Sequence, residues 1–211
     1  LSEAELIRHV DGLLERNRSS REVLSFLGAG CYRHQVPAVC DEINSRGEFL
    51  TAYAGEPYED HGRFQALFEY ASMMGELLEM DVVNIPVYDG FQASATALRM
   101  AARITGRRQV ILGGMINPAK LLKVEDYCRL GPEIILLPSD LDSGLLDLAR
   151  LEMLVSEETA AVYFENPAFH GIVESGGAGV AALAHRVGAL CIVGCDPISL
   201  GILAPPADYG A

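Results

Sequence analysis

Residues 62–211 alternate short apolar runs with helical segments, and this alternation most constrains the fold. The apolar runs have the length of buried strands and cover Val110 to Leu112, Ile134 to Leu137, Ala160 to Phe164 and Leu190 to Val193. The helical segments begin near Gln92, Pro118, Gly144 and Gly177. Because each helix must bury its apolar stripe, this order predicts right-handed crossover units on a parallel sheet that is covered on both faces. We therefore expect an open, doubly wound α/β domain.

Residues 1–61 have a different character, and we expect them to form a helical arm and an extended leader. From Glu3 to Glu15 apolar side chains recur three and four positions apart, which predicts an amphipathic helix. Ser2 and Glu5 have the spacing of a capping box at its start. One more short helix is expected from Pro37 to Arg46, within a segment rich in aromatic residues, glycine and proline.

The second domain, residues 62–211, begins on a helix and ends just after a strand. A broad apolar face between Gly62 and Met80 predicts a buried helix at its start. Asp196 and Pro197 follow the last strong strand, and the sequence stops at Ala211 without a closing helix. We therefore expect a partial domain whose sheet is cut off by a truncation.

Composition argues against several classes of partner and site. The formal charge of -13, with 29 acidic against 16 basic residues, opposes docking on nucleic acid or on anionic membranes. No stretch approaches the ~20 apolar residues that cross a bilayer. The five cysteines form no CxxC pair, so neither a disulfide framework nor a metal site is expected. The first residues lack the pattern of a signal peptide, and a cytoplasmic location fits best.

Polar side chains follow two of the predicted strands. Asp196 comes directly after the last strand, and Asn166 follows the preceding one, which also carries Tyr163 and leads to His170. Ligands of open α/β sheets bind at the carboxyl ends of the strands, so these groups could converge on a ligand. A loop or helix-cap role for Asp196 is the alternative.

Two further sets of residues are candidates for binding or catalysis. Asp89 and Gly90 precede a helix, whose backbone N–H groups and positive dipole could hold a phosphate, although a plain turn and helix cap explains them equally well. His34 and His61 lie near tyrosines and could act as acid, base or stacking group, or could be ordinary surface histidines.

Four segments, read together, resemble the first subunit of the glycine cleavage system P-protein. They are FLGAGCYRHQVPAVCDEINSRGEFLTAY, FQALFEYASMMGELLEMDVVN, VYDGFQASATALRMAAR and IVGCDPISLGILAPPADYGA. The resemblance runs from about Leu24 to the last residue, in family order and with nearly family spacing. It implies the large α/β domain of fold type I pyridoxal phosphate (PLP) enzymes, incomplete and preceded by a helical arm. It also implies participation in glycine decarboxylase, which releases carbon dioxide and passes an aminomethyl group to the lipoylated H-protein.

The resemblance also implies where the cofactor is held. In such enzymes a lysine binds the cofactor covalently and an aspartate pairs with its pyridine nitrogen, and the aspartate position matches Asp196. The only lysines here, Lys120 and Lys123, lie far upstream of that position. The family's two-subunit form places the lysine, and hence PLP, on the second subunit.

In that case this chain has no Schiff-base lysine of its own and acts as a partner that completes the subunit interface. The resemblance implies a cytoplasmic heterotetramer, with glycine as substrate and with interface candidates at Tyr53 and His61. The chain's own cofactor-binding residues would be vestigial, and they are Asp196, Asn166, Asp89 and Gly90.

Two departures from the family pattern bear on the site. The helix entry reads DGFQA where DGATA is common, so Phe91 and Gln92 have replaced a hydroxyl, which argues against phosphate binding at this loop. After TAY the chain reads AGEPYEDHGRFQ, where family members read something like TPYQPEISQGTLQ, so substrate contacts there are in doubt. Two alternatives stay open: a non-catalytic pseudo-subunit, and an independent PLP-dependent aminotransferase or lyase whose lysine lies beyond Ala211.

Overall fold

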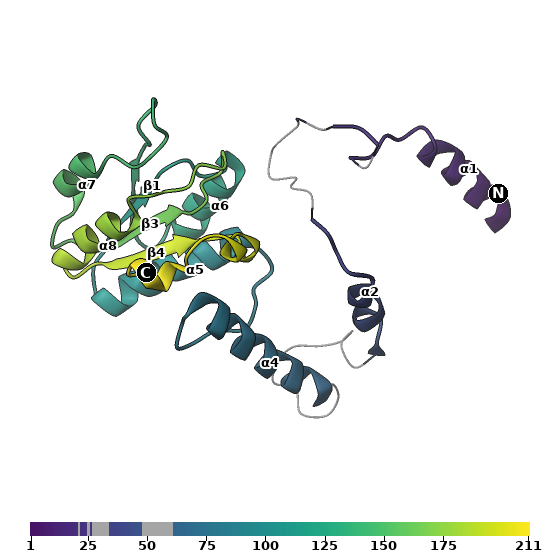
Figure 1. The fold of residues 1–211 in the computed structure, drawn as a ribbon, viewed down its shortest axis with the longest axis horizontal. Coiled ribbons are helices and arrows are strands. Elements are labelled where there is room, and N and C mark those ends of the chain that lie inside the picture. Colours follow the sequence, from purple (N-terminus) through teal and green to yellow (C-terminus); the bar gives the residue numbers. More distant parts are fainter. Residues whose placement is uncertain (21, 25, 27–33, 48–60) are drawn as a thin grey trace. The chain divides into compact units, whose positions relative to one another are not determined.

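The computed structural model describes residues 1–20, 22–24, 26, 34–47 and 61–211 (Figure 1). In the range 61–211, the backbone is described throughout and the side chains are described from residue 65 onward. The chain divides into two units, Leu1–Ile43 and Asn44–Ala211. The domain boundary that the sequence predicts at residue 61 stays a prediction.

The first unit contains the predicted arm helix, α1 (Glu3–Leu14). Its capping box is present, because the Glu5 carboxylate accepts a hydrogen bond of 2.7 Å from the backbone N–H of Ser2. None of its residues is buried within the described structure. The second expected helix, α2 (Ala38–Asn44), is also present.

The second unit is built on a sheet of parallel strands in the order β2-β1-β3-β4. The strands are β1 (Gln109–Gly113), β2 (Glu133–Leu137), β3 (Thr159–Glu165) and β4 (Leu190–Gly194). Ile111 of β1 is paired with Val162 of β3, which in turn is paired with Cys191 of β4. Each predicted apolar run lies within one of these strands, so the predicted parallel sheet is confirmed.

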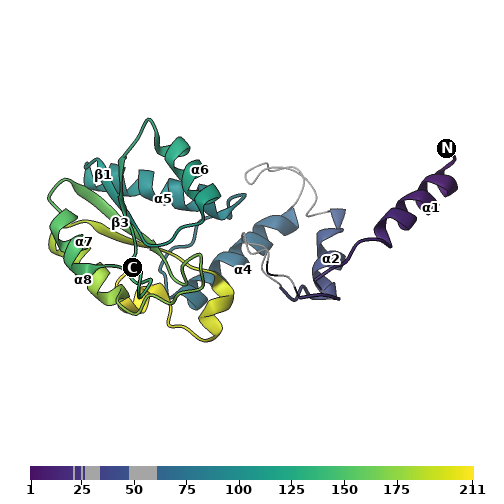
Figure 2. The same cartoon turned by 90° about the horizontal axis from the view of Figure 1, so that it is seen from above.

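Helices cover both faces of this sheet, as Figure 2 shows. One face packs against α5 (Gly90–Thr105) and α6 (Pro118–Cys128), and the other against α7 (Leu148–Leu154) and α8 (Gly177–Arg186). Alternate strand residues enter separate cores: Val110 and Leu112 pack with Leu98 of α5, whereas Ile111 packs with Val180 of α8. This is the doubly wound architecture that the sequence predicts.

One predicted helix start is wrong by several residues. The segment expected to become helical near Gly144 first forms a turn, in which Gly144 has a φ of +73°, and α7 begins only at Leu148. A Cβ at Gly144 would lie 2.1 Å from the Cδ1 of Ile172, so a loop distant in sequence fixes this turn. The helix starts where Asp147 can cap it, by accepting a 3.0 Å hydrogen bond from the Arg150 N–H.

The helix α4 (His61–Leu78) exists as predicted, but its apolar face is not buried. Phe68 is 68% exposed and Met73 is 65% exposed, because among the described elements α4 contacts chiefly η1 (Pro197–Gly201). A second 3-10 helix, η2 (Pro206–Tyr209), packs on α8 near the end of the chain. In the part of the chain that the structure describes, no helix has both the length and the apolar character that a bilayer crossing needs.

Candidate functional site

Asp196 and Asn166 lie just past the carboxyl ends of adjacent strands. Asn166 follows β3, and its backbone N–H donates a 2.9 Å hydrogen bond to the carbonyl oxygen of Gly194 in β4. Asp196 is exposed, and its carboxylate accepts a 3.0 Å hydrogen bond from the backbone N–H of Ile198 at the start of η1. The geometry therefore gives Asp196 a capping contact. Its role towards a cofactor stays a prediction.

The side chain of Asn166 is buried and holds the loop that follows β3. Its Oδ1 accepts a 3.0 Å hydrogen bond from the Glu174 N–H, and its Nδ2 lies 3.3 Å from the Glu174 carbonyl oxygen and 3.5 Å from the Tyr209 hydroxyl. The Glu174 carboxylate in turn accepts from the backbone N–H groups of Leu146 and Gly176. Asn166 thus has its amide satisfied by the protein itself.

Asp89 and Gly90 form the entry to α5, and the chain's own groups cap that entry. The Asp89 Oδ1 accepts a 2.9 Å hydrogen bond from the Gln92 N–H, and the Gln92 Oε1 lies 3.3 Å from the backbone nitrogen of Tyr88. The Asp89 side chain thus caps the helix, and the Gln92 side chain reaches back to the residue before the cap. Gly90 lies beside Lys120, whose Nζ would be 3.9 Å from a Cβ added at Gly90.

Lys120 is the centre of a polar cluster between α5, α6 and the end of β3. Its Nζ donates to the Glu165 Oε1 at 2.5 Å and to the Tyr163 hydroxyl at 3.0 Å. The Tyr163 hydroxyl donates to the same Glu165 oxygen at 2.9 Å and lies 3.0 Å from the Ser94 Oγ. The side chains of Lys120 and Glu165 are only 22% and 12% exposed, so the ion pair is mostly shielded from water.

This cluster determines the protonation states of its members. Burial alone would lower the pKa of Lys120, but Tyr163 and Glu165 outweigh that effect through charge and hydrogen bonds and raise the pKa above its ordinary value. Burial, followed by the Glu165 charge, raises the pKa of Tyr163 to about 12. Lys120 is therefore a charged ammonium group near neutral pH, and a charged amine is no nucleophile.

The sequence points to Tyr163 and Lys120 individually but does not show that Glu165 connects them. Lys120 and Glu165 are 45 positions apart, and only the packing of α6 against the strand ends brings them together. A signal was present in the sequence, because Glu165 is the one charged residue of an otherwise largely apolar strand. A buried charge at such a position requires a partner of opposite charge.

The remaining candidates are dispersed. Tyr53 lies outside the described residues, and His61 begins α4 with a side chain that is also outside them. His34 is exposed, and the exposed His170 has its ring centroid 5.2 Å from that of Phe169. The structure thus does not test Tyr53 or the side chain of His61 as interface residues.

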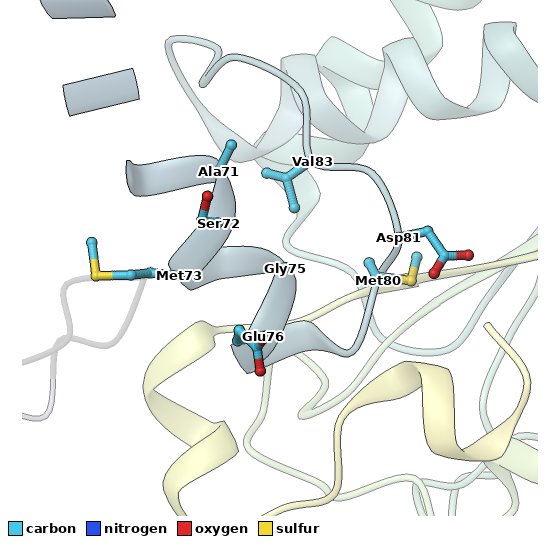
Figure 3. Close-up of a pocket in the computed structure, with 8 residues that line it drawn as sticks. All are labelled: Ala71, Ser72, Met73, Gly75, Glu76, Met80, Asp81 and Val83. Atoms are coloured by element: carbon cyan, nitrogen blue, oxygen red, sulfur yellow. The ribbon is translucent and has the colours of Figure 1, made fainter. Parts of the chain in front are cut away.

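A groove is formed by α4 and the loop that follows it. It has a volume of about 390 Å³ and is lined by Ala71, Ser72, Met73, Gly75, Glu76, Met80, Asp81 and Val83. Figure 3 shows the carboxylates of Glu76 and Asp81 on this segment. The lining has two acidic side chains and no basic one, so it does not suit a phosphate-bearing ligand.

A second, much smaller cavity lies at the strand ends. Its volume is about 10 Å³, which suits one water molecule but no aromatic ring. Gly113, Gly114 and Glu165 are among its lining residues. Ser139 also lines it, and the Ser139 Oγ is buried without a hydrogen-bond partner among the described groups.

Comparison with known proteins assigns the chain to a family. The family model of the glycine cleavage system P-protein matches residues 1–211. The chain belongs to this family. The "probable glycine dehydrogenase (decarboxylating) subunit 1" of Chlorobium phaeobacteroides is 40% identical over the whole chain, and that of Carboxydothermus hydrogenoformans is 41% identical. The chain covers 48% and 47% of these relatives, so it spans about half their length.

Solved structures agree with this assignment to the P-protein family. A crystal structure of glycine decarboxylase (P-protein) in inhibitor-bound form matches the whole chain with a TM-score of 0.86 and 36% identity, and the chain covers 47% of it. A NifS-like protein matches 72% of the chain with a TM-score of 0.56 and 17% identity, and the chain covers 42% of it. The second likeness concerns the fold alone. The chain thus has the fold type I architecture of PLP-dependent enzymes.

The described residues of this chain do not fit PLP. Lys120 is held by Glu165 and Tyr163, and the ammonium of Lys123 lies 4.8 Å from the centroid of the Phe91 ring. The ammonium group beside the α5 entry is thus already neutralised, and the cavity at the strand ends is too small for a pyridine ring. In the described part of the chain, Lys120 is thus held in an ion pair and Lys123 lies over an aromatic ring.

Proposed function

We propose that the protein carrying this chain is a subunit of glycine decarboxylase, the P-protein of the glycine cleavage system. The family match over residues 1–211 carries this proposal, together with the 36% identical P-protein structure that superposes on the whole chain. Glycine is then the substrate, carbon dioxide is released, and an aminomethyl group passes to the lipoylated H-protein.

The proposal places PLP on a second, PLP-bearing P-protein subunit. Two observations support this placement: both lysines of this chain are engaged by other side chains, and the α5 entry is capped by its own residues. Asp196, Asn166, Asp89 and Gly90 would then be remnants of a cofactor site that positions backbone. PLP supplies the electron sink for decarboxylation in enzymes of this type, and here it would do so from the partner.

This chain would contribute surface to the assembly. The exposed apolar face of α4 is suited to a protein partner, because Phe68 and Met73 are each about two-thirds exposed. Tyr53 and His61 stay candidates at the subunit interface. A cytoplasmic heterotetramer is the form of the enzyme that we propose.

Co-expression with a PLP-bearing second subunit tests the placement of the cofactor. We expect the two proteins to co-purify, and we expect PLP to remain with the second subunit when the two are separated. Absorbance of the bound cofactor near ~420 nm reports its location. Recovery of covalently bound PLP on the protein carrying this chain would contradict the proposal, and so would failure of the two proteins to associate.

A further inference from the structure

The ion pair of Lys120 and Glu165 lies beside the first turn of α5. The Lys120 Nζ would be 3.9 Å from a Cβ at Gly90, the first residue of that helix. The pair joins three elements, because Lys120 belongs to α6, Glu165 ends β3, and Tyr163 links them to Ser94 of α5. A charge pair thus lies beside the helix entry for which the sequence leaves two readings, a phosphate site and a plain helix cap.

The groups beside this helix terminus are chemically suited to an anion. Each end of an α-helix carries about half an elementary charge, which is positive at its N-terminus. An adjacent lysine ammonium adds a full positive charge and three hydrogen-bond donors. Glu165 supplies the anion from within the chain, since its Oε1 accepts from both the Lys120 Nζ and the Tyr163 hydroxyl.

We infer that Glu165 excludes phosphate-bearing ligands from this site, because its carboxylate is already paired with the Lys120 ammonium that a phosphate would need. The inference rests on the proposed function only in taking a PLP-like phosphate ester as the ligand that is excluded. An entering phosphate would have to displace a shielded carboxylate held by two donors, or lie next to it. Both routes are unfavourable, because like charges repel strongly where water is scarce.

Glu165→Gln tests the inference, because it removes the negative charge and nearly preserves the shape. The probe is pyridoxine 5′-phosphate, which has no aldehyde and so cannot react with a lysine. Equilibrium dialysis with the full-length protein, in the absence of any partner, gives its dissociation constant. We expect Glu165→Gln to bind at least ~10-fold more tightly than the unchanged protein, the effect of one hydrogen bond to a charged group.

Two further variants separate charge from other effects. Glu152→Gln breaks an exposed ion pair, in which the Glu152 Oε1 and the Arg186 Nη1 lie 2.6 Å apart. This control variant should bind pyridoxine 5′-phosphate as the unchanged protein does. The double variant Glu165→Gln with Lys120→Met should lose the gain, because the ammonium has been removed. Circular dichroism verifies that each variant folds. If Glu165→Gln does not fold, Glu165→Met replaces it as the variant that removes the negative charge.

The inference is overturned if Glu165→Gln gains no affinity, if the unchanged protein already binds as tightly, or if pyridoxine without phosphate shows the same gain. It is also overturned if the gain survives Lys120→Met. None of these outcomes depends on decarboxylation. Loss of glycine decarboxylation in the assembled enzyme would therefore contradict the proposed function and leave this inference intact.

Discussion

Tyr163 shows how a single residue connects the core to the polar cluster. Its ring is buried against the α5 face of the sheet and is only 2% exposed, whereas its hydroxyl contacts Lys120, Glu165 and Ser94. Such a residue is costly to ionise in the folded protein, because burial and the Glu165 charge both oppose a tyrosinate.

The raised pKa of Tyr163 predicts a specific dependence of stability on pH. Between the ordinary value of 10.0 and about 12, the folded protein keeps the phenolic proton while the unfolded chain releases it. The free energy of unfolding should therefore fall as pH rises through this window, by up to about 2 to 3 kcal/mol from this group.

Urea unfolding at a series of pH values from 9 to 12 measures this effect. Tyr163→Phe lacks the titrating hydroxyl, so its stability should fall less steeply over the same range, although it is expected to be less stable at pH 9. Parallel pH curves for the two proteins would show that Tyr163 ionises as easily in the folded state as in the unfolded one.

Elements differ in how far their positions follow from local sequence. The strands were predictable because a parallel strand buried on both faces is a continuous apolar run. The start of α7 was not, because the turn at Gly144 depends on Ile172, which is distant in sequence. For the same reason the Lys120 to Glu165 contact could not be predicted, whereas the capping of α5 by Asp89 is local and is one of the two readings that the sequence allows.

The turn before α7 should not tolerate a side chain at Gly144. Gly144→Ala would combine a left-handed φ with a Cβ 2.1 Å from Ile172, so we expect destabilisation of about 2 to 4 kcal/mol. Gly171 has a φ of +80° and no neighbouring heavy atom within 4 Å of an added Cβ. Gly171→Ala is therefore the matched control, with an expected loss of about 1 kcal/mol from φ alone. Equal losses in urea unfolding would refute the role of Ile172.

The cap of α5 should contribute measurably to stability. Asp89→Ala removes the acceptor of the Gln92 N–H and should lower the free energy of unfolding by about 1 kcal/mol. Asp89→Asn keeps a good capping oxygen and should stay close to the unchanged protein. A loss as large for asparagine as for alanine would indicate that the carboxylate charge matters more than the cap.

At the scale of the whole molecule, this chain offers a fold and surfaces but no cofactor anchor of its own within the described residues. The comparisons assign it to the P-protein family over its entire length. The resemblance in sequence was sufficient to predict the fold, because the apolar runs and the family segments agree. The location of the cofactor does not follow from the fold.

Release of labelled carbon dioxide from carboxyl-labelled glycine tests whether the protein that carries this chain is a subunit of glycine decarboxylase. The assay contains lipoylated H-protein, PLP and the second subunit, with or without the full-length protein that carries this chain. We predict rapid release only when both subunits are present, and background release with either one alone. Equal release by the second subunit alone, or no release by the two together, would contradict it.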